Sequence, residues 1–161
     1  MAKPREVKDL HCEEPFALAA ARVVEVRADE LLEHSHGVLD TDDIEAVHDM
    51  RVASRRLRAA LEVFKPCFPR KRFRAALEAV KAIADALGER RDRDVSIAAL
   101  EAFSEELVAG DRHGVGVLVE RLREEQALAN DRLVPFVEQE RLIELRERVG
   151  ELVSAAREKA A

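Results

Sequence analysis

HDMRVASRRLRAALEVF, residues 48–64, is the stretch that decides the fold, and LGERRDRDV at residues 87–95 closes the same segment. On a helical wheel, where successive residues are about 100° apart, Met50, Ser54, Leu57, Leu61 and Phe64 fall on one side, which is mostly apolar. Such a pattern predicts an amphipathic helix whose apolar side faces a core. An arginine-rich edge runs beside that apolar side. The elements that pack against this helix must therefore cover its apolar side and leave room for, or neutralise, its arginine-rich edge.

The composition of the whole chain favours helices. Of the 161 residues, 47% are hydrophobic and 37% are charged, whereas only six are Gly and five are Pro. Ala, Leu, Glu and Arg are abundant, and they are strong helix formers. No segment alternates polar and apolar residues as a half-buried strand does. We therefore predict an all-α protein, an antiparallel helical bundle with short loops.

The expected helix boundaries follow from breakers and caps. Pro66 and Pro69 interrupt the apolar periodicity, Gly88 ends the next repeat, and Pro135 marks a break or kink. We expect Asp94 to cap a helix that follows a short turn after Gly88. The expected helices, about six in all, cover residues 15–36, 42–64, 70–87, 94–108, 115–133 and 136–157.

One helical domain is expected at residues 14–161, preceded by a flexible arm at residues 1–13. No apolar run approaches the roughly 20 residues that span a bilayer, and the polar start of the chain is no signal peptide. The two cysteines, Cys12 and Cys67, fit no metal spacing and are expected to be free thiols in a reducing cytoplasm.

Positive charge is concentrated in residues 48–95. This segment holds thirteen Lys and Arg against seven Asp and Glu, a net charge of +6. The whole chain carries −6, so the remainder carries −12. An acidic chain that gathers its cations in one segment is expected to hold a polyanion there.

Four basic side chains form a ridge along the helix predicted at residues 48–64. On the wheel His48, Arg51, Arg55 and Arg58 lie within about 80° of one another, directly beside the apolar side. Three guanidiniums on one ridge repel each other unless an anion, or acids from a neighbouring helix, neutralise them. The structural alternative is a solvated charged face, but such a face normally mixes both signs four residues apart.

Two motifs of this segment resemble the CHAD family, the conserved-histidine α-helical domain: HDMRVASRRLRA at residues 48–59 and LGERRDRDV at residues 87–95. The resemblance covers residues 14–136 in order and character. It implies an all-helical, non-catalytic module without a cofactor that binds inorganic polyphosphate. Such modules often accompany polyphosphate-metabolising enzymes and can direct proteins to polyphosphate granules. The residues that the resemblance places at the ligand are His48, Arg51, Arg55, Arg56, Arg58, Lys81 and Arg91.

The sequence departs from the family in one respect. CHAD domains usually contain two similar helical halves about a pseudo-twofold axis, each with its own basic helix. Residues 112–161 show no second copy of the ridge, and their arginines are interleaved with acids. We therefore expect a homodimer whose twofold axis brings two basic helices across one channel.

Two interpretations of His48 stay open. Its place in the ridge makes it a pH-sensitive contact to the ligand. Its place at the edge of the apolar side also suits a half-buried histidine that is hydrogen-bonded to a neighbouring helix.

Nucleic-acid binding is an alternative function because a basic helix can lie along a phosphate backbone. The net charge is negative, however, and six Phe are the only aromatic residues, so platforms for stacking bases are scarce. No groove-reading motif is present. Nucleic acid is therefore disfavoured as a partner.

Two kinds of metal-dependent chemistry are further alternatives. Glu33-x-x-His36 and Glu45-x-x-His48 have the E-x-x-H spacing of ferritin-like di-metal proteins, but such a site needs two more inward glutamates. Asp92-x-Asp94 is a weak pair of metal ligands for phosphoryl transfer, and no glycine-rich phosphate loop accompanies it. Acids beside arginines more often orient or neutralise them, so we expect no catalytic residues.

Overall fold

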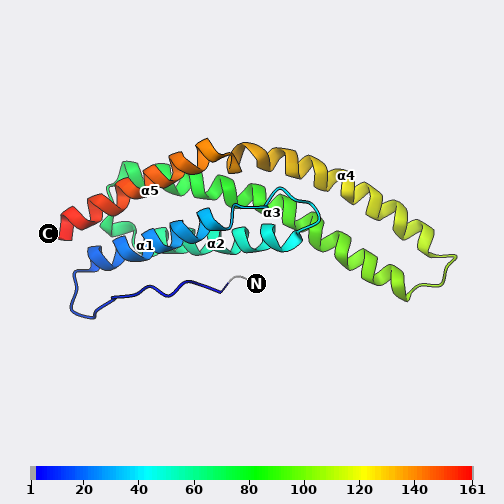
Figure 1. Cartoon of the computed structure of the whole chain (residues 1–161), viewed down its shortest axis with the longest axis horizontal. Coiled ribbons are helices and arrows are strands. Elements are labelled where there is room, and N and C mark those ends of the chain that lie inside the picture. The colour runs from blue at the N-terminus through cyan, green and yellow to red at the C-terminus, as the bar shows by residue number, and fades with distance from the viewer. Residues whose placement is uncertain (1–2, 161) are drawn as a thin grey trace.

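The computed structural model describes residues 3–160 and is all-helical, as the composition predicts (Figure 1). This part of the chain forms five α-helices and one turn of 3-10 helix, whereas the sequence predicts about six α-helices. The elements are α1 (Phe16–Glu33), α2 (Ile44–Val63), the 3-10 turn η1 (Lys65–Cys67), α3 (Arg70–Glu106), α4 (Arg112–Val137) and α5 (Gln139–Ala160).

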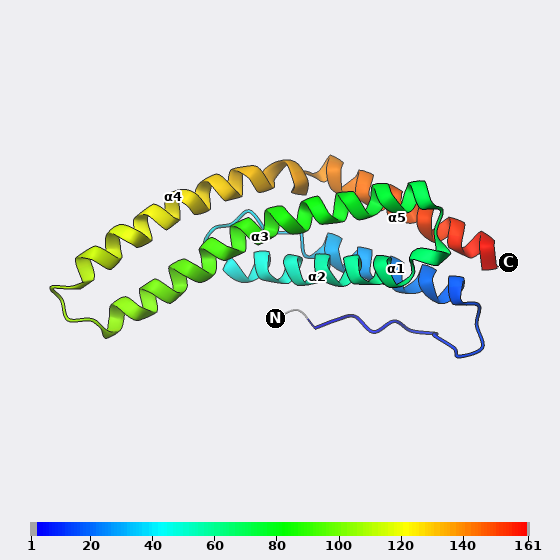
Figure 2. The same ribbon diagram turned by 180° about the vertical axis from the view of Figure 1, so that it is seen from behind.

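Helices α1, α2 and α5 and the N-terminal half of α3 lie side by side as a bundle. Helix α1 packs on α2 and α5, and α3 packs on α2, α4 and α5. The C-terminal half of α3 and the start of α4 project from the bundle as an antiparallel hairpin (Figures 1 and 2). The long helix α3 therefore connects the core of the bundle to the projecting hairpin.

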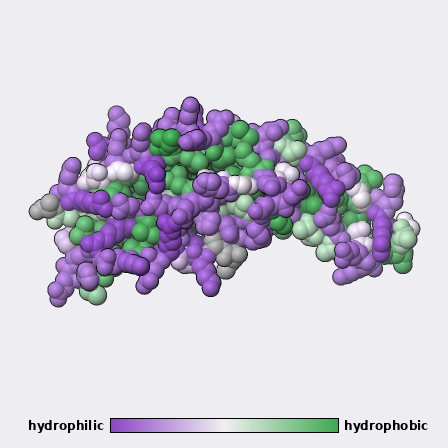
Figure 3. All heavy atoms as spheres, viewed as in Figure 1, coloured by the Kyte–Doolittle hydropathy of each residue, from purple (hydrophilic) through white to green (hydrophobic). Residues whose placement is uncertain are grey.

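The core is built from apolar side chains of all five described helices, and most of them come from α1, α2, α3 and α5. Leu31, Met50, Leu57, Leu87 and Leu152 are all fully buried. Burying a side chain of this size contributes about 1.5–3 kcal/mol. The face of the molecule shown in Figure 3 is mostly hydrophilic, with hydrophobic areas along its upper middle part and on the hairpin. Within residues 3–160 no helix has the length and apolar character needed to cross a membrane.

Helix α3 continues through Gly88, so the predicted helix end at Gly88, the turn after it and the cap at Asp94 are wrong. Among the glycines that the structure describes, only Gly37 has a positive φ, 72°. Gly88 therefore lacks the left-handed conformation with which glycine ends a helix. The helix persists because Arg90 and Asp94 form a buried ion pair where α4 packs against α3. Tertiary packing here overrides helix propensity.

Other helix boundaries differ from the predicted ones by only a few residues. Asp43 caps α2, and its Oδ1 accepts hydrogen bonds from the backbone N–H groups of Glu45 (3.1 Å) and Ala46 (3.2 Å). Pro135 lies inside the last turn of α4, and α5 begins at Gln139. The break between the two helices therefore comes just after the proline, which removes only one backbone hydrogen bond from α4.

The segment that precedes α1 contacts that helix through Arg5. The backbone N–H of Arg5 donates to Oε1 of Glu30 (2.6 Å), and its guanidinium pairs with Glu33. In return, Nη2 of Arg27 donates to the carbonyl oxygen of Arg5 (3.0 Å). These contacts tie the N-terminal segment to one side of α1.

Candidate functional site

Helix α2 places the predicted ridge along one edge of the bundle. The apolar side of α2 is fully buried, so side chains next to it on the wheel lie at the boundary between core and solvent. His48 and Arg51 are accordingly half-buried, whereas Arg55 is exposed. The side chain of Arg58 is partly exposed. The amphipathic pattern of one helix thus sets the position of all four residues.

Helix α3 lies beside this ridge. A Cβ atom added to Gly88 would lie 3.9 Å from Nε of Arg51, and Nη1 of Arg91 donates a hydrogen bond to the carbonyl oxygen of Ile44 (2.9 Å). These two contacts identify the face of α3 that is turned toward α2. Lys81 lies two turns before Gly88 and within about 20° of it on the wheel. The fold therefore brings Lys81 and Arg91 to the side of α3 that borders the ridge.

These residues form one surface, and most of its cations have no acid partner in the part of the chain that the structure describes. Arg58 is the exception, because its Nε donates to Oε1 of Glu62 (3.0 Å). Within residues 3–160, the side chains of Arg51, Arg55 and Lys81 form no ion pair and no hydrogen bond. Unneutralised cations on adjacent helices attract anions. We call this group the basic surface; its members are His48, Arg51, Arg55, Arg58, Lys81 and Arg91.

Arg56, which the resemblance also places at the ligand, lies on another side of α2. Its Nη1 is 3.7 Å from Oε1 of Glu30 in α1, a residue that is only 2% exposed. Glu30 also pairs with Arg27. Arg56 therefore belongs to an ion-pair cluster between α1 and α2. Sequence reasoning missed Glu30, for which Arg27, three residues before it, is the only local signal.

His48 is half-buried at the N-terminal end of the ridge, one turn before Arg51. Its imidazole forms no hydrogen bond within the described part of the chain. The half-burial of His48 agrees with the structural interpretation, but the hydrogen bond to a neighbouring helix that this interpretation also expects is not found among the described residues.

A buried ionic network supports the part of α3 that carries Arg91. Nη1 of Arg90 lies 3.0 Å from Oδ2 of Asp94, and both side chains are buried. Nε2 of Gln126 in α4 donates to Oδ1 of Asp94 (2.7 Å). Burial lowers the pKa of Arg90 and raises the pKa of Asp94, while the opposite charge of each partner limits both shifts. Asp94 thus pairs with an arginine, as expected, but from inside a helix.

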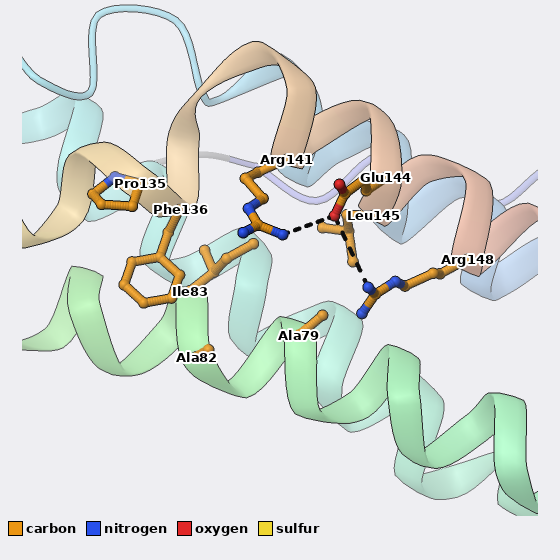
Figure 4. Close-up of a pocket in the computed structure, with 9 residues that line it drawn as sticks. All are labelled: Ala79, Ala82, Ile83, Pro135, Phe136, Arg141, Glu144, Leu145 and Arg148. Carbon is orange, nitrogen blue, oxygen red and sulfur yellow. Dashed lines mark hydrogen bonds and ion pairs between the residues drawn. The ribbon is translucent and has the colours of Figure 1, made fainter.

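A cavity of about 410 Å³ lies between α3 and the junction of α4 with α5 (Figure 4). Ile83 and Phe136 contribute to its apolar lining. At its rim Arg141 and Arg148 both point to Glu144, at 3.0 Å and 3.9 Å. None of the predicted site residues lines this cavity, and its two arginines share an acid. It is therefore separate from the basic surface.

The E-x-x-H pairs do not form a metal site in the described chain. Glu33 pairs instead with Arg5, and Nδ1 of His36 lies 3.0 Å from the carbonyl oxygen of Glu33, beyond the end of α1. Residues 3–160 contain no group of three or more His, Cys, Asp and Glu side chains that could hold a metal ion.

Comparison with known proteins gives one match. No curated protein and no solved structure matches the chain. The family model of the CHAD domain matches residues 22–161, which is nearly the whole chain. That range includes α2, α3 and every residue of the basic surface. The chain therefore belongs to the CHAD-domain family.

Proposed function

We propose that this chain is a non-catalytic module that binds inorganic polyphosphate on the basic surface. The observation that carries the proposal is the presence, on adjoining faces of α2 and α3, of Arg51, Arg55 and Lys81, which have no acid partner among residues 3–160. Membership of the CHAD family supports it, because the family resemblance implies polyphosphate as the ligand.

Binding would be electrostatic. Guanidinium groups donate paired hydrogen bonds to phosphate oxygens, and counterions leave both partners. Affinity should therefore fall steeply with salt concentration. Arg91 already donates one hydrogen bond to Ile44, which fixes the orientation of its guanidinium and leaves other N–H groups for phosphate. Arg58 would exchange Glu62 for a phosphate group.

Nucleic acid is the main competing ligand, because it also presents a chain of phosphates. A fluorescence titration of the protein with labelled long-chain polyphosphate, with DNA or RNA as competitor at matched phosphate concentration, tests the choice. The proposal predicts that nucleic acid displaces polyphosphate only at a large excess, because the chain has few aromatic residues for stacking bases. Displacement at equal phosphate concentration would contradict it.

A homodimer would complete the site, because one chain supplies a single basic helix. The projecting hairpin offers apolar contact area: Val95 and Phe103 of α3 and Val117 and Leu128 of α4 are each at least half exposed. We expect sedimentation equilibrium to show a dimer and Phe103→Glu to weaken it. A monomer with and without polyphosphate would contradict this expectation.

The proposed place of action is the cytoplasm, at polyphosphate granules or beside polyphosphate-metabolising enzymes. A fluorescent fusion of the chain is expected to gather on stained granules. The same fusion with Arg51→Ala and Arg55→Ala should be diffuse, because granule binding would use the basic surface. Equal recruitment of both fusions would indicate that a partner protein, and not polyphosphate, directs localisation.

A further inference from the structure

The turn between α2 and α3 carries cations that lie outside the basic surface. Residues 63–77 contain five Lys and Arg and no Asp or Glu. Helix α3 begins here with no side-chain cap at Pro69 and no acid in its first turn. No acidic residue nearby in the sequence therefore compensates the positive charge at this end of the bundle. The five cations are Lys65, Arg70, Lys71, Arg72 and Arg74.

Arg70 and Arg74 are exposed and unpaired, unlike Arg72. Arg72 forms an ion pair with Glu151 of α5 (3.6 Å). By contrast, the side chains of Arg70 and Arg74 form no ion pair or hydrogen bond with any residue of the described range 3–160. Their charges are therefore free to act on a ligand.

Arg70 and Arg74 also continue the line of Lys81 along α3. They lie eleven and seven residues before Lys81, so the three side chains fall within about 40° on the wheel and span about 16 Å. Gly88, two turns beyond Lys81, lies beside Arg51 of α2. The line of three cations therefore runs along the side of α3 that borders the basic surface.

The positions of the acidic residues of α3 determine along which part of the helix the surface is positively charged. Glu78, Asp85 and Asp92 are exposed and lie within about 60° of Lys81 on the wheel. They lower the potential along the middle of α3 and toward the hairpin. Between Glu78 and the N-terminus of α3 there is no further acid. A polyanion that extends past Glu78 is therefore attracted toward the α2–α3 turn, where only cations follow.

We infer that Arg70 and Arg74 form a second contact region, which a polyphosphate chain reaches only when it is long enough to extend from the basic surface to the α2–α3 turn. This inference rests on the proposed function and adds to it a dependence on chain length. A short chain can occupy the ridge, where Arg51 and Arg58 are about 10 Å apart along the helix axis. A longer chain gains further contacts without dissociating from the first ones.

Calorimetric titration with two ligands, tripolyphosphate and long-chain polyphosphate, tests the inference on the wild-type chain and on Arg70→Ala/Arg74→Ala. The variant is expected to bind the long chain about tenfold more weakly, because two exposed charge contacts are lost. Its affinity for tripolyphosphate should equal that of the wild type. Both side chains are exposed and have no partner among the described residues, so the variant should keep the helix content and unfolding transition of the wild type.

A matched control removes two charges elsewhere. In Arg121→Ala/Arg141→Ala the lost side chains are exposed on α4 and α5, and both ligand affinities are expected to stay near wild type. Unchanged long-chain affinity in Arg70→Ala/Arg74→Ala, or an equal loss in the control, would overturn the inference and leave the proposed function standing. If Arg70→Ala/Arg74→Ala lost affinity equally for tripolyphosphate and long-chain polyphosphate, the inference would also be overturned and the proposed function would stand. If the wild type binds neither ligand, the proposed function itself fails.

Discussion

Gly88 of α3 lies against Arg51 of α2: a Cβ atom at Gly88 would be 3.9 Å from Nε of the arginine. The glycine therefore marks the place where the side chain of Arg51 reaches α3 at the basic surface, and not the end of a helix. A side chain much larger than a methyl group at this position would extend into the space that the guanidinium occupies.

Two replacements of Gly88 separate its effect on helix stability from its effect on the position of Arg51. Gly88→Ala should raise the free energy of unfolding by about 0.5–1 kcal/mol, because alanine is the better helix former and its Cβ has room. Gly88→Leu should keep the fold but displace Arg51 and weaken polyphosphate binding. Urea denaturation and ligand titration of the two variants check this. If the leucine variant bound polyphosphate as tightly as the alanine variant, the expected displacement of Arg51 by a larger side chain at position 88 would be contradicted.

The buried pair of Arg90 and Asp94 should be costly to break. Arg90→Met leaves a buried carboxylate that keeps its hydrogen bond to Gln126 but has lost its ion-pair partner, and should lower the free energy of unfolding by about 3–5 kcal/mol at neutral pH. Arg90→Met/Asp94→Leu should recover most of the loss, because an apolar pair of similar volume needs no hydration. Urea denaturation of both variants at neutral pH measures the difference.

The pH dependence of the Arg90→Met variant has a definite sign. Burial raises the pKa of Asp94 in the folded state, and loss of Arg90 removes a charge that lowers it. A carboxyl whose folded pKa exceeds its unfolded pKa holds its proton more tightly when folded, so stability falls as pH rises through that window. Arg90→Met should therefore be more stable at pH 5 than at pH 7, relative to the double variant. A parallel pH profile for both variants would show that Asp94 is not the responsible group.

The two thiols should differ in reactivity. Cys12 is exposed, whereas Cys67 is buried, and burial raises the pKa of the Cys67 thiol above its usual value, against the smaller effect of Lys159. The thiolate is the reactive form, so iodoacetamide should label Cys12 quickly near pH 8 and Cys67 only at higher pH or after unfolding. Mass spectrometry of the labelled peptides checks this. Equal labelling of both cysteines in the folded chain would contradict the burial of Cys67.

Glu62 should weaken polyphosphate binding. It holds Arg58 at 3.0 Å and places a negative charge on the ridge. Glu62→Gln removes that charge, so the affinity for long-chain polyphosphate should rise about two- to fivefold at low salt. Glu25→Gln is a matched control, because Glu25 forms a comparable surface ion pair with Arg157 of α5. An equal gain in both variants would attribute the effect to net charge alone.

The sequence predicts the fold class and the ridge because both depend on periodicity within single helices. Arg51, Arg55 and Arg58 lie at i, i+4 and i+7, so their common edge follows from helix geometry alone. The continuation of α3 through Gly88 could not be predicted in this way. It depends on the burial of Arg90 and Asp94 against α4, and Gln126 is 32 residues from Asp94 in the chain.

The partner of Arg56 could not be predicted from the local pattern either. The motif groups Arg56 with its neighbours in the basic helix, but its position on the wheel turns it toward α1, where Glu30 is buried. Nothing near Arg56 in the sequence identifies that partner. Arg70 and Arg74 were visible as charges, but their alignment with Lys81 depends on which face of α3 borders α2, and Gly88 and Arg91 identify that face only in the structure.

The central claim, that the basic surface holds polyphosphate, is tested most directly by calorimetric titration with long-chain polyphosphate at two salt concentrations. The proteins are the wild type, Arg51→Ala/Arg55→Ala/Arg58→Ala, and the control Arg121→Ala/Arg141→Ala/Arg146→Ala, which removes the same charge from exposed positions on α4 and α5. We predict salt-sensitive binding by the wild type and the control, and its loss in the folded ridge variant. Unchanged binding by the ridge variant, or no binding by the wild type, would contradict the claim.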